Sequence, residues 1–534
     1  MQYNSRVMPT DPPQEETAEI ARAAGIIALG NIASRVLGLV RETVKSHYFG
    51  AGGAVDALSV ATIVPTMLYD LLIGGMVSSA LVPIFSEYAT KKGRDELWGL
   101  VSALLSLAVV ALAVFVVLVE ALAPQVAFLL SSGSSPDVLA LTARLLRITV
   151  PAVLFLSLSG VLSGLLFALR RFSFPAFTAA AFNAAIVIVT LAFHAQLDVA
   201  SMALGLLTGA FLQVALQFPG LRDARLRFRL TLNHPGLRRI AVLYAPIVLG
   251  LAVDILISRP ISYNLASRTG EGGISWMTYA TTLVQFPQGL VATAISIAIL
   301  PTLSTQFNGP DGGPFRATLA RGLRLVIVLI LPATVGLLIL AHPTVALIFE
   351  HGDFLAHDTA MTARALQLYV LGLPFAAIDL LLVYAFYAQQ DTLTPALIGV
   401  GTIAAYLTIA TLLLPTLGLF SLMVADSVKF VLHAVISWAI LRRRAGRLSE
   451  HAVGRTLGIA LAASAVMGVV AASALWGIRQ AAAGESLLAE AAALIVPGVV
   501  GAGVYLALVS ALGVEEFRML WGAVRRRLAG GGGA

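Results

Sequence analysis

Residues 22–46 form an apolar segment with an unusual number of charged side chains. Its polar residues fall three or four apart and therefore share one face of a helix: Asn31, Arg35, Gly38, Glu42 and Lys45. Arg41 lies at the edge of this stripe. A guanidinium group binds phosphate through two parallel hydrogen bonds, so arginines gathered here suit an anionic ligand that carries phosphate.

A helix with this stripe must be held away from lipid, because a charge at the bilayer centre costs about 2.5 kcal/mol or more. We therefore expect the stripe to line an aqueous cavity. Gly30, Ser34 and Gly38 are spaced four apart, a pattern of small residues that lets another helix approach closely. Lys45, near the helix end, is expected to reach water.

Carboxylates accompany these cations. Asp56 and Asp70 lie in the next apolar segment, and we expect them, with Glu42, to orient the arginines or to close a gate. The alternative is that Arg35–Glu42 and Arg41–Asp56 are ion pairs that only brace the helices.

Residues 240–266 hold a second set of charges. Pro246 and Pro260 bracket Asp254 and Arg259, and prolines predict kinks that suit a bending gate. Asp254 lies one turn before Ser258 and is a candidate for binding a coupling ion. An ion pair between Asp254 and a neighbouring helix is the alternative.

Two later apolar segments contain titratable side chains. Asp426, Lys429 and His433 share a helical face and predict either a self-neutralised pair or a proton relay, of which the pair is the simpler interpretation. Asp426 is the second ion-coupling candidate. Asp379 has no predicted partner.

The composition identifies the class of protein. Of 534 residues, 58% are hydrophobic and 12% charged, whereas soluble domains carry about 25% charged residues. We predict an all-α polytopic membrane protein, because fourteen segments approach the roughly 20 residues that cross a bilayer. They are 22–46, 56–80, 99–121, 142–169, 174–194, 199–219, 240–266, 276–303, 323–341, 362–388, 395–414, 418–441, 456–478 and 487–512.

The basic residues predict the orientation. In a chain with fourteen spans, 23 Lys and Arg fall at one set of alternating ends and loops, and only Arg268 and Arg479 at the other. Because cytoplasmic loops are the basic ones, both termini are expected in the cytoplasm. No cleaved signal peptide is expected. The predicted divisions are a tail 1–19, a lobe 20–220, a basic linker 221–239, a lobe 240–442, a helix pair 443–512 and a basic tail 513–534.

A repeat is predicted, because similar residues recur at a nearly constant interval along the chain. Glycines at 52–53 correspond to those at 272–273, and Pro175 corresponds to Pro395. Six spans separate the copies, so they share an orientation, as in transporters with parallel repeats. The architecture is then two six-helix lobes plus a C-terminal helix pair. Chance similarity between apolar helices is the alternative.

Enzyme motifs are absent from the sequence. It has no Walker loop, no metal-ligand spacing and no nucleophile elbow. No cysteine is present, which excludes disulfides and thiolate chemistry. We expect no enzymatic activity, no cofactor, no metal and no nucleic-acid partner. The net charge of +7 fits attraction to anionic membrane lipids.

Several ordered motifs resemble the MurJ/MviN family of the multidrug/oligosaccharidyl-lipid/polysaccharide flippase superfamily. They cover about residues 20–440 and are 33–42 (ASRVLGLVRE), 48–52 (YFGAG), 82–88 (VPIFSEY), 171–177 (RFSFPAF), 275–280 (SWMTYA), 286–289 (FPQG), 300–304 (LPTLS) and 387–395 (YAQQDTLTP). The resemblance implies a fourteen-helix flippase for lipid II, the undecaprenyl-diphosphate-linked peptidoglycan precursor. It also implies a bacterial cytoplasmic (inner) membrane location, a role in cell-wall synthesis, a cationic cavity between two lobes, and a groove for the lipid tail beside the last two spans.

The family's first-helix and second-helix site residues fall on Ser34, Arg35, Arg41, Glu42 and Asp56. The resemblance thus implies that Ser34 and the two arginines bind substrate. A monomer is expected.

The sequence departs from the family at several positions. Two cavity arginines of the family are replaced by Tyr69 and Thr282, and Arg259 is a candidate to compensate. The span-11 sodium ligands of some members are absent around Tyr406 and Ala410. We therefore favour a proton as the coupling ion, with a sodium gradient or the membrane potential as alternatives.

Two alternative functions stay open. The lost arginines favour a flippase for another polyprenyl-linked glycan. The intramembrane carboxylates Asp254 and Asp426 suit a cation-coupled small-molecule exporter, although such exporters in this superfamily typically have twelve spans.

Overall fold

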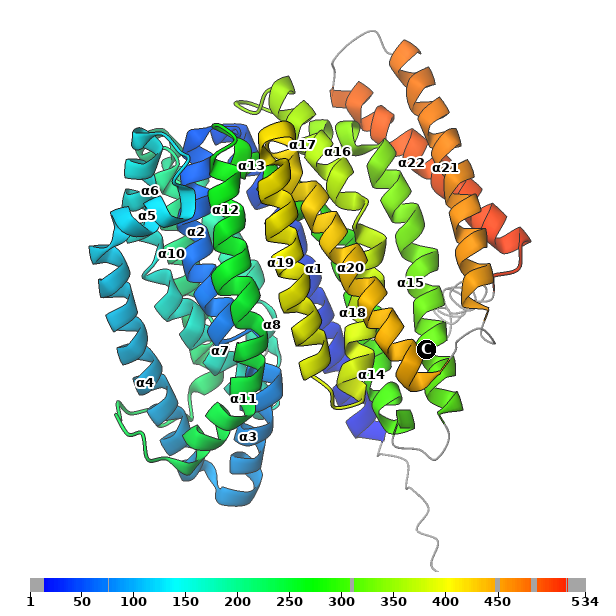
Figure 1. Cartoon of the computed structure of the whole chain (residues 1–534). Helices are drawn as coiled ribbons and strands as arrows, with labels where there is room; N and C mark the ends of the chain where they lie inside the picture. The colour runs from blue at the N-terminus through cyan, green and yellow to red at the C-terminus, as the bar shows by residue number, and fades with distance from the viewer. Residues whose placement is uncertain are drawn as a thin grey trace, which may run out of the picture. The chain divides into compact units, whose positions relative to one another are not determined.

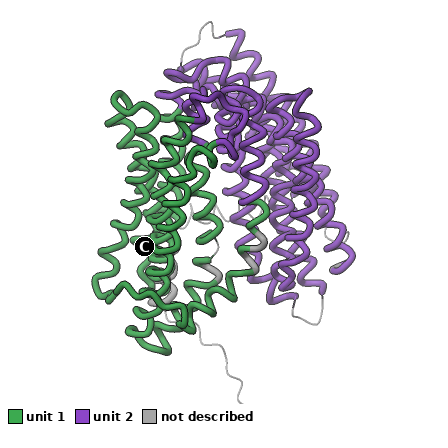
Figure 2. The backbone as a smooth tube through the Cα atoms, turned by 60° about the vertical axis from the view of Figure 1, so that its left-hand side comes forward, with its two compact units in different colours: residues 1–45, 60–127, 140–255 green, residues 46–59, 128–139, 256–534 purple. Residues whose placement is uncertain are grey.

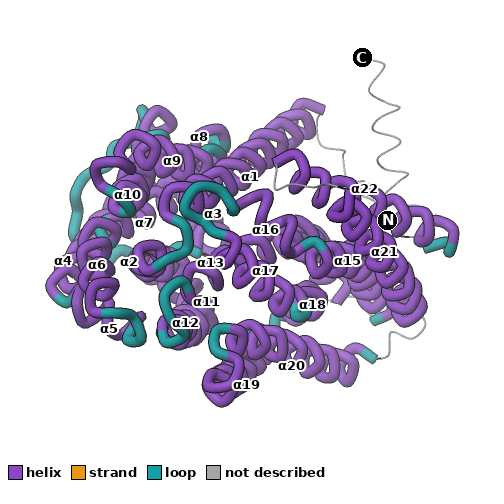
Figure 3. The backbone as a smooth tube through the Cα atoms, turned by 90° about the horizontal axis from the view of Figure 1, so that it is seen from above, coloured by secondary structure: helices purple, strands orange, loops and turns teal. Residues whose placement is uncertain are grey.

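The computed structural model describes residues 14–74, 76–307, 312–446, 452–481, 487–514 and 516. Within these ranges every regular element is a helix, and Figure 3 shows helices joined by loops. Helices are expected for so apolar a chain, because in lipid each backbone N–H and C=O must bond within its own segment. Residues 1–13 and 517–534 of the predicted tails, and Arg447, lie outside the described residues.

Contacts divide the chain into two compact units, coloured separately in Figure 2. Unit 1 comprises residues 1–45, 60–127 and 140–255, and unit 2 comprises residues 46–59, 128–139 and 256–534. This division by contact differs in kind from the predicted division by membrane topology, which stays a prediction.

Unit 1 draws on the helices of the first half of the chain, some of which extend into unit 2. The helices are α1 Gln14–Phe49, α2 Gly53–Leu72, α3 Val82–Glu87, α4 Arg94–Ala121, α5 Ala123–Ser131, α6 Pro136–Thr149, α7 Ala152–Ala168, α8 Ser173–Ala176, α9 Thr178–Leu197, α10 Ala200–Ala215 and α11 Pro235–Val253. Its core packs α3, α4 and α7 through fully buried side chains such as Phe85, Leu97 and Leu165.

Unit 2 contains the remaining helices. They are α12 Arg259–Ser267, α13 Gly273–Pro287, α14 Ala294–Phe307, α15 Gly313–Ile339, α16 Ala341–Phe349, α17 Ala356–Val370, α18 Leu373–Ala388, α19 Leu393–Leu417, α20 Phe420–Ala445, α21 Val453–Ala481 and α22 Leu487–Ala511. Its core includes the Tyr279 ring, whose centroid lies 4.8 Å from that of Phe349 and 5.3 Å from that of Phe354. The last two helices, α21 and α22, pack side by side (Figure 1).

Eleven helical runs of the described chain are long and apolar enough to cross a membrane. The pair α17–α18, bent by 45°, makes a twelfth. These runs coincide with twelve of the predicted segments. The other two, 22–46 and 240–266, are also helical, as α1 and α11–α12. They are the segments in which the sequence placed most intramembrane charge.

The described helices contain four π-helical turns: Val77–Leu81, Tyr88–Lys92, Asp254–Ser258 and Gln288–Thr293. Pro83 and Pro260 each follow one of these turns by two residues. Proline lacks the N–H that would bond one turn back, and its ring needs room there, which a wider turn supplies. Such turns are frequent at functional sites.

Backbone features recur at the predicted interval. The helices α2 and α13 begin at residues 53 and 273, and α10 and α20 at residues 200 and 420. Positive φ angles recur as well: 58° at Arg170 and 60° at Gln390, then 50° at Asp198 and 54° at Gly418. The two halves therefore share local structure at the interval that relates Pro175 to Pro395.

Candidate functional site

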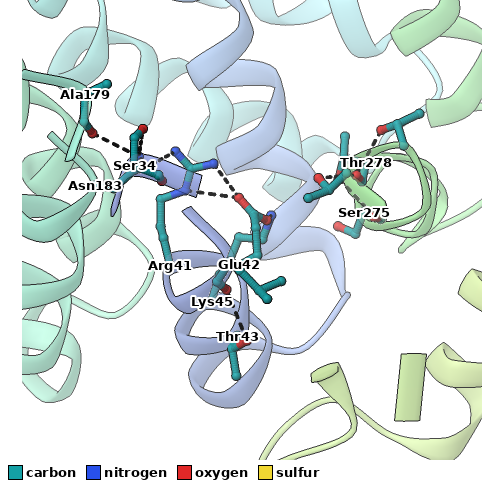
Figure 4. A network of polar contacts seen from close by, with 12 residues as sticks. Ser34, Arg41, Glu42, Thr43, Lys45, Ala179, Asn183, Ser275 and Thr278 are labelled. Carbon is teal, nitrogen blue, oxygen red and sulfur yellow. Dashed lines mark hydrogen bonds and ion pairs between the residues drawn. The ribbon is translucent and has the colours of Figure 1, made fainter. Parts of the chain in front are cut away.

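A charged cluster lies on α1. The Glu42 carboxylate is buried and accepts hydrogen bonds from Arg41 Nη2 at 2.6 Å and Arg41 Nε at 3.1 Å. Lys45 Nζ pairs with its other oxygen. Lys45 is 7% exposed, so the expectation that it reaches water was wrong: its ion pair keeps it inside. Figure 4 shows this cluster from close by.

Asn183 of α9 connects the cluster to the rest of unit 1. Its Oδ1 accepts a hydrogen bond from Arg41 Nη1 at 3.0 Å, and its Nδ2 donates to the Ser34 carbonyl at 3.3 Å (Figure 4). The Arg41 guanidinium is therefore held at both ends, by a carboxylate and by an amide. Sequence reasoning missed Asn183, whose only signal was one amide within the otherwise apolar run 179–189.

The predicted stripe of small residues packs as expected. A Cβ added at Gly30 would lie 2.0 Å from the Ala176 carbonyl oxygen, and one added at Gly38 would lie 3.8 Å from Asn183 Nδ2. Ser34, between them, bonds to Asn183. The absent side chains let α1 approach α8 and α9 closely, which brings Arg41 within reach of Asn183.

The other predicted site residues occupy several places. Arg35 is exposed on α1, and Asp70 is half-buried near the end of α2. Asp254 opens a π-helical turn in unit 1, and Arg259 begins α12 in unit 2. Of the predicted set, the structure brings Ser34, Arg41 and Glu42 into one network.

Asp56 lies in unit 2, at the start of α2, and is 3% exposed. Its Oδ2 accepts a hydrogen bond from Gly272 N at 2.7 Å, and its Oδ1 accepts from Ser275 N at 2.8 Å and Ser275 Oγ at 2.6 Å. These donors belong to the first turn of α13, whose N–H groups have no partner within the helix. Asp56 therefore caps α13 from another helix.

We expect Asp56→Ala to lower the free energy of unfolding by roughly 2–4 kcal/mol, because it leaves buried donors of α13 without an acceptor. Asp56→Asn should cost less, since the amide keeps one accepting oxygen. Thermal unfolding of the purified variants measures both, and equal melting temperatures for wild type and Asp56→Ala would contradict the capping role.

Two acidic side chains of α18 and α20 are paired. Asp426 bonds to Lys429 Nζ at 2.6 Å, which confirms the predicted self-neutralised pair. Asp379, for which the sequence predicted no partner, has two: its Oδ1 lies 2.6 Å from His433 Nδ1 and accepts from Ser437 Oγ at 3.2 Å. The partners are 54 and 58 residues away, beyond the reach of helical periodicity.

Two ion pairs tie helix ends together outside the spans. In unit 1, Arg171 Nη1 lies 2.6 Å from Asp223 Oδ1, and the hydrogen bond from Arg171 lowers the pKa of Asp223. In unit 2, Arg444 Nη1 lies 2.5 Å from Asp391 Oδ2. Asp391 also accepts from Thr394 N and Oγ1. Desolvation opposes ionisation of Asp391, but the bonds from Thr394 and Arg444 outweigh it and hold its pKa at about 2.

We expect Asp391→Ala to destabilise the protein more than Arg444→Ala. The Arg444 side chain is 46% exposed, so solvent screens the pair, which contributes about 1 kcal/mol or less. Asp391 additionally caps the N-terminus of α19 through its bonds from Thr394, which contributes about 1 kcal/mol to the free energy of unfolding. Its folded pKa is below the ordinary 3.8. Wild type should therefore have a higher free energy of unfolding than Asp391→Ala above about pH 4, and this difference should vanish as pH falls toward 2. Melting temperatures across this range measure it.

An apolar groove lies between α15, α21 and α22 in unit 2. Its volume is about 300 Å³. It is lined chiefly by aliphatic side chains and small residues, among them Pro332, Gly336, Met467, Pro497, Gly501 and Tyr505. Such a lining accepts a hydrocarbon chain and offers little to a polar ligand. Elsewhere, no three His, Asp or Glu side chains of the described residues are grouped to hold a metal ion.

The chain was compared with known proteins. Residues 45–491 match the sequence model of the family described as lipid II flippase MurJ. The lipid II flippase MurJ of Burkholderia cenocepacia is 34% identical over 421 residues, which cover 77% of this chain and 81% of that protein. The probable lipid II flippase MurJ of Vibrio cholerae is 30% identical over 507 residues, covering 92% and 95%.

Solved structures show the same fold. A lipid II flippase MurJ in an inward closed conformation aligns with a TM-score of 0.77 at 23% identity, over 91% of this chain and 98% of that one. An inward-facing multidrug resistance MATE family transporter aligns with a TM-score of 0.65 at 14% identity, over 78% and 96%.

Proposed function

This chain belongs to the lipid II flippase MurJ family, and from that premise we propose that it moves lipid II across the bacterial cytoplasmic membrane. The cargo would be an undecaprenyl-diphosphate-linked saccharide used for cell-wall synthesis. It would pass from the cytoplasmic to the outer leaflet by alternating access. The chain would act as a multi-pass transporter and not as an enzyme.

The observation that carries this proposal is the Arg41 network on α1. A membrane helix keeps a cation and an anion only where they serve a ligand or a partner. Here the guanidinium is held in place by Glu42 and Asn183 and is still 31% exposed. An oriented and partly accessible guanidinium suits the diphosphate of a lipid carrier.

We assign the remaining site residues by the same chemistry. Ser34, Arg35 and Arg259 join Arg41 as substrate-binding residues. Glu42 orients Arg41, and Asp56 and Asp70 act as gate residues or charge partners. Asp254 and Asp426 are candidates for coupling to an ion gradient. The membrane potential is the alternative driving force.

The groove between α15, α21 and α22 is the proposed site for the undecaprenyl tail. Its aliphatic lining matches the chemistry of a polyprenyl chain. The helices α21 and α22 follow the two repeats, and their role would be to form this groove together with α15.

We propose fourteen spans, because α1 and α11–α12 are helices long enough to cross the bilayer when their charges are shielded from lipid. The spans would form two six-helix lobes, within 20–220 and 240–442, followed by α21 and α22. Both termini would lie in the cytoplasm, and the protein would act as a monomer among membrane lipids without a nucleic-acid partner.

A second candidate function follows from Tyr69 and Thr282, which stand where the family carries arginines. They favour a flippase for another polyprenyl-linked glycan. A cation-coupled exporter of the same fold is less well supported, since it would leave the groove beside α21 and α22 without a role.

Complementation tests the proposal. The gene is expressed in bacteria depleted of their own lipid II flippase, with Arg41→Ala as the inactive control. Growth with the wild-type gene alone is expected. Failure of a well-expressed wild-type protein would overturn lipid II as the cargo and favour another glycan.

A further inference from the structure

Three polar side chains join α18 and α20 inside unit 2. Asp379 Oδ1 lies 2.6 Å from His433 Nδ1, and Ser437 Oγ lies 3.2 Å from each of these atoms. The Asp379 and His433 side chains are only 11% and 13% exposed, and Ser437 is fully buried. An ionised carboxylate only accepts hydrogen bonds, so Nδ1 carries the proton of the imidazole. This leaves Nε2 of His433, on the side facing Gly399 of α19, to gain or lose a second proton.

The first repeat has an uncharged cluster at the corresponding positions. Shifted by the interval that relates Pro395 to Pro175, Asp379, His433 and Ser437 fall on Ser159, Gln213 and Gln217. Ser159 Oγ donates to Gln213 Oε1 at 3.1 Å and lies 2.7 Å from Gln217 Nε2. These partners are again separated by 54 and 58 residues. The same junction, between α7 and α10, is thus made by neutral hydrogen bonds.

This correspondence distinguishes a purely structural role of Asp379 and His433 from a role in proton binding. Since serine and glutamine suffice to hold one copy of the junction, a carboxylate and an imidazole are not needed to hold the other. With His433 neutral the Asp379–His433 pair carries a net charge of −1, and with His433 protonated it carries none. The Asp379–His433 pair can therefore exist in two charge states, which the serine and glutamines of the first repeat cannot.

We propose that Asp379, His433 and Ser437 form a proton-binding site that couples transport to the proton gradient. His433 Nε2 takes up a proton from water on one side of the membrane and returns it to water on the other. Asp379 holds the ring and balances its charge, and Ser437 completes the cluster. This rests on the proposed transport function, and it adds Asp379 and His433 to the coupling candidates Asp254 and Asp426.

Other titratable groups lie on the helices around this cluster. The helices α14 and α19 and the turn Gln288–Thr293, which pack against α18 or α20, carry no charged residue. On α20, Lys429 is paired with Asp426 and lies over the Phe430 and Tyr406 rings. The remaining groups on neighbouring helices are Arg259 and Tyr263 of α12, Tyr384 and Tyr387 of α18, His357, Asp358, Arg364 and Tyr369 of α17, Arg316, Arg321 and Arg324 of α15, and Arg442, Arg443 and Arg444 at the end of α20.

The decisive variant copies the neutral cluster into the second repeat: Asp379→Ser, His433→Gln and Ser437→Gln together. Because the first repeat folds with this set, the triple variant keeps hydrogen bonds at the junction. Purified protein in liposomes is assayed for lipid II translocation with and without an imposed gradient of one pH unit. One coupled proton sustains at most about a tenfold accumulation ratio at that gradient.

Wild type is expected to approach this ratio, whereas the triple variant, Asp379→Asn and His433→Gln should equilibrate lipid II between leaflets without responding to the gradient. The matched control is His357→Gln, which removes an exposed imidazole of unit 2 and should keep the full response. A gradient response retained in the triple variant would show that the cluster only braces α18 and α20.

A second measurement does not depend on transport. Ring-¹⁵N-labelled protein in lipid nanodiscs is titrated between pH 5 and 9, and His433→Gln assigns the His433 resonances. His433 is expected to change charge within this range, and Asp379→Asn to displace that change. An imidazole that stays neutral or stays charged throughout would overturn the proposal. If the wild-type protein did not transport lipid II, the proposed cargo would be refuted. This titration would still decide whether the site binds a proton.

Discussion

Arg41→Ala is expected to lower lipid II translocation at least about thirtyfold while the protein remains folded in the membrane. Truncating one member of a desolvated charge pair typically costs 2–5 kcal/mol of binding free energy, and about 1.4 kcal/mol corresponds to a factor of ten. Two losses combine here, because the diphosphate loses a ligand and Glu42 loses a partner. Reconstituted flux, compared at equal amounts of folded protein, measures the effect.

The control for Arg41 separates ligand binding from bracing. Arg41→Lys keeps the charge but not the two-pronged geometry, so it should rescue flux only in part. Arg35→Ala should lower flux as well, because Arg35 lies on the same helix. Asn183→Ala leaves Arg41 charged but releases one end of it, and should weaken lipid II binding less than Arg41→Ala. Normal flux in Arg41→Ala would show that the Arg41 network only braces α1 and does not bind the substrate.

Gly336→Phe is expected to block transport of the full-length carrier by filling the apolar groove. Gly336 lines the groove, and no atom lies within 4 Å of a Cβ built there, so the new side chain enters open space. A phenyl group would take up part of this cavity of about 300 Å³ and narrow it where a chain would lie. We expect a loss of flux of tenfold or more for the undecaprenyl carrier, since the tail would have to leave its apolar site. Carriers with a much shorter polyprenyl chain should be affected less.

The matched control is Gly477→Phe. Gly477 lies on α21, outside the groove, and a Cβ there also meets no atom within 4 Å. It should leave flux and melting temperature near those of wild type. If Gly336→Phe and Gly477→Phe transport equally well, the groove does not hold the tail.

Sequence reasoning identified the helices because hydropathy is a local property. Twelve of the predicted segments match runs apolar enough to span a bilayer, and the other two are helical as well. The stripe of Gly30, Ser34 and Gly38 was also predictable, because spacing along one helix determines its face. Glu42 was found, although its partner Lys45 was expected in water.

Partners on different helices were not predictable in the same way. Asn183 and the Asp379–His433 pair depend on which helices are neighbours, and periodicity within one helix carries no such information. The repeat did hold a signal for the second case. Aligning the two halves at the interval of the repeat would have shown that Asp379 and His433 correspond to polar residues, Ser159 and Gln213, in the first half.

The ion pairs Arg171–Asp223 and Asp391–Arg444 bear on how a duplicated chain avoids assembling with itself in the wrong order. They occupy corresponding places in the two halves, but the charges appear in opposite order along the chain. The first pair has its cation before its anion, and the second has its anion before its cation. Two copies of one helical hairpin, made in succession by the ribosome, invite an exchange of equivalent segments. Such an exchange would set Arg171 against Arg444 and Asp223 against Asp391, and like charges disfavour both encounters. The reversed order of charges therefore disfavours pairing between equivalent segments of the two halves.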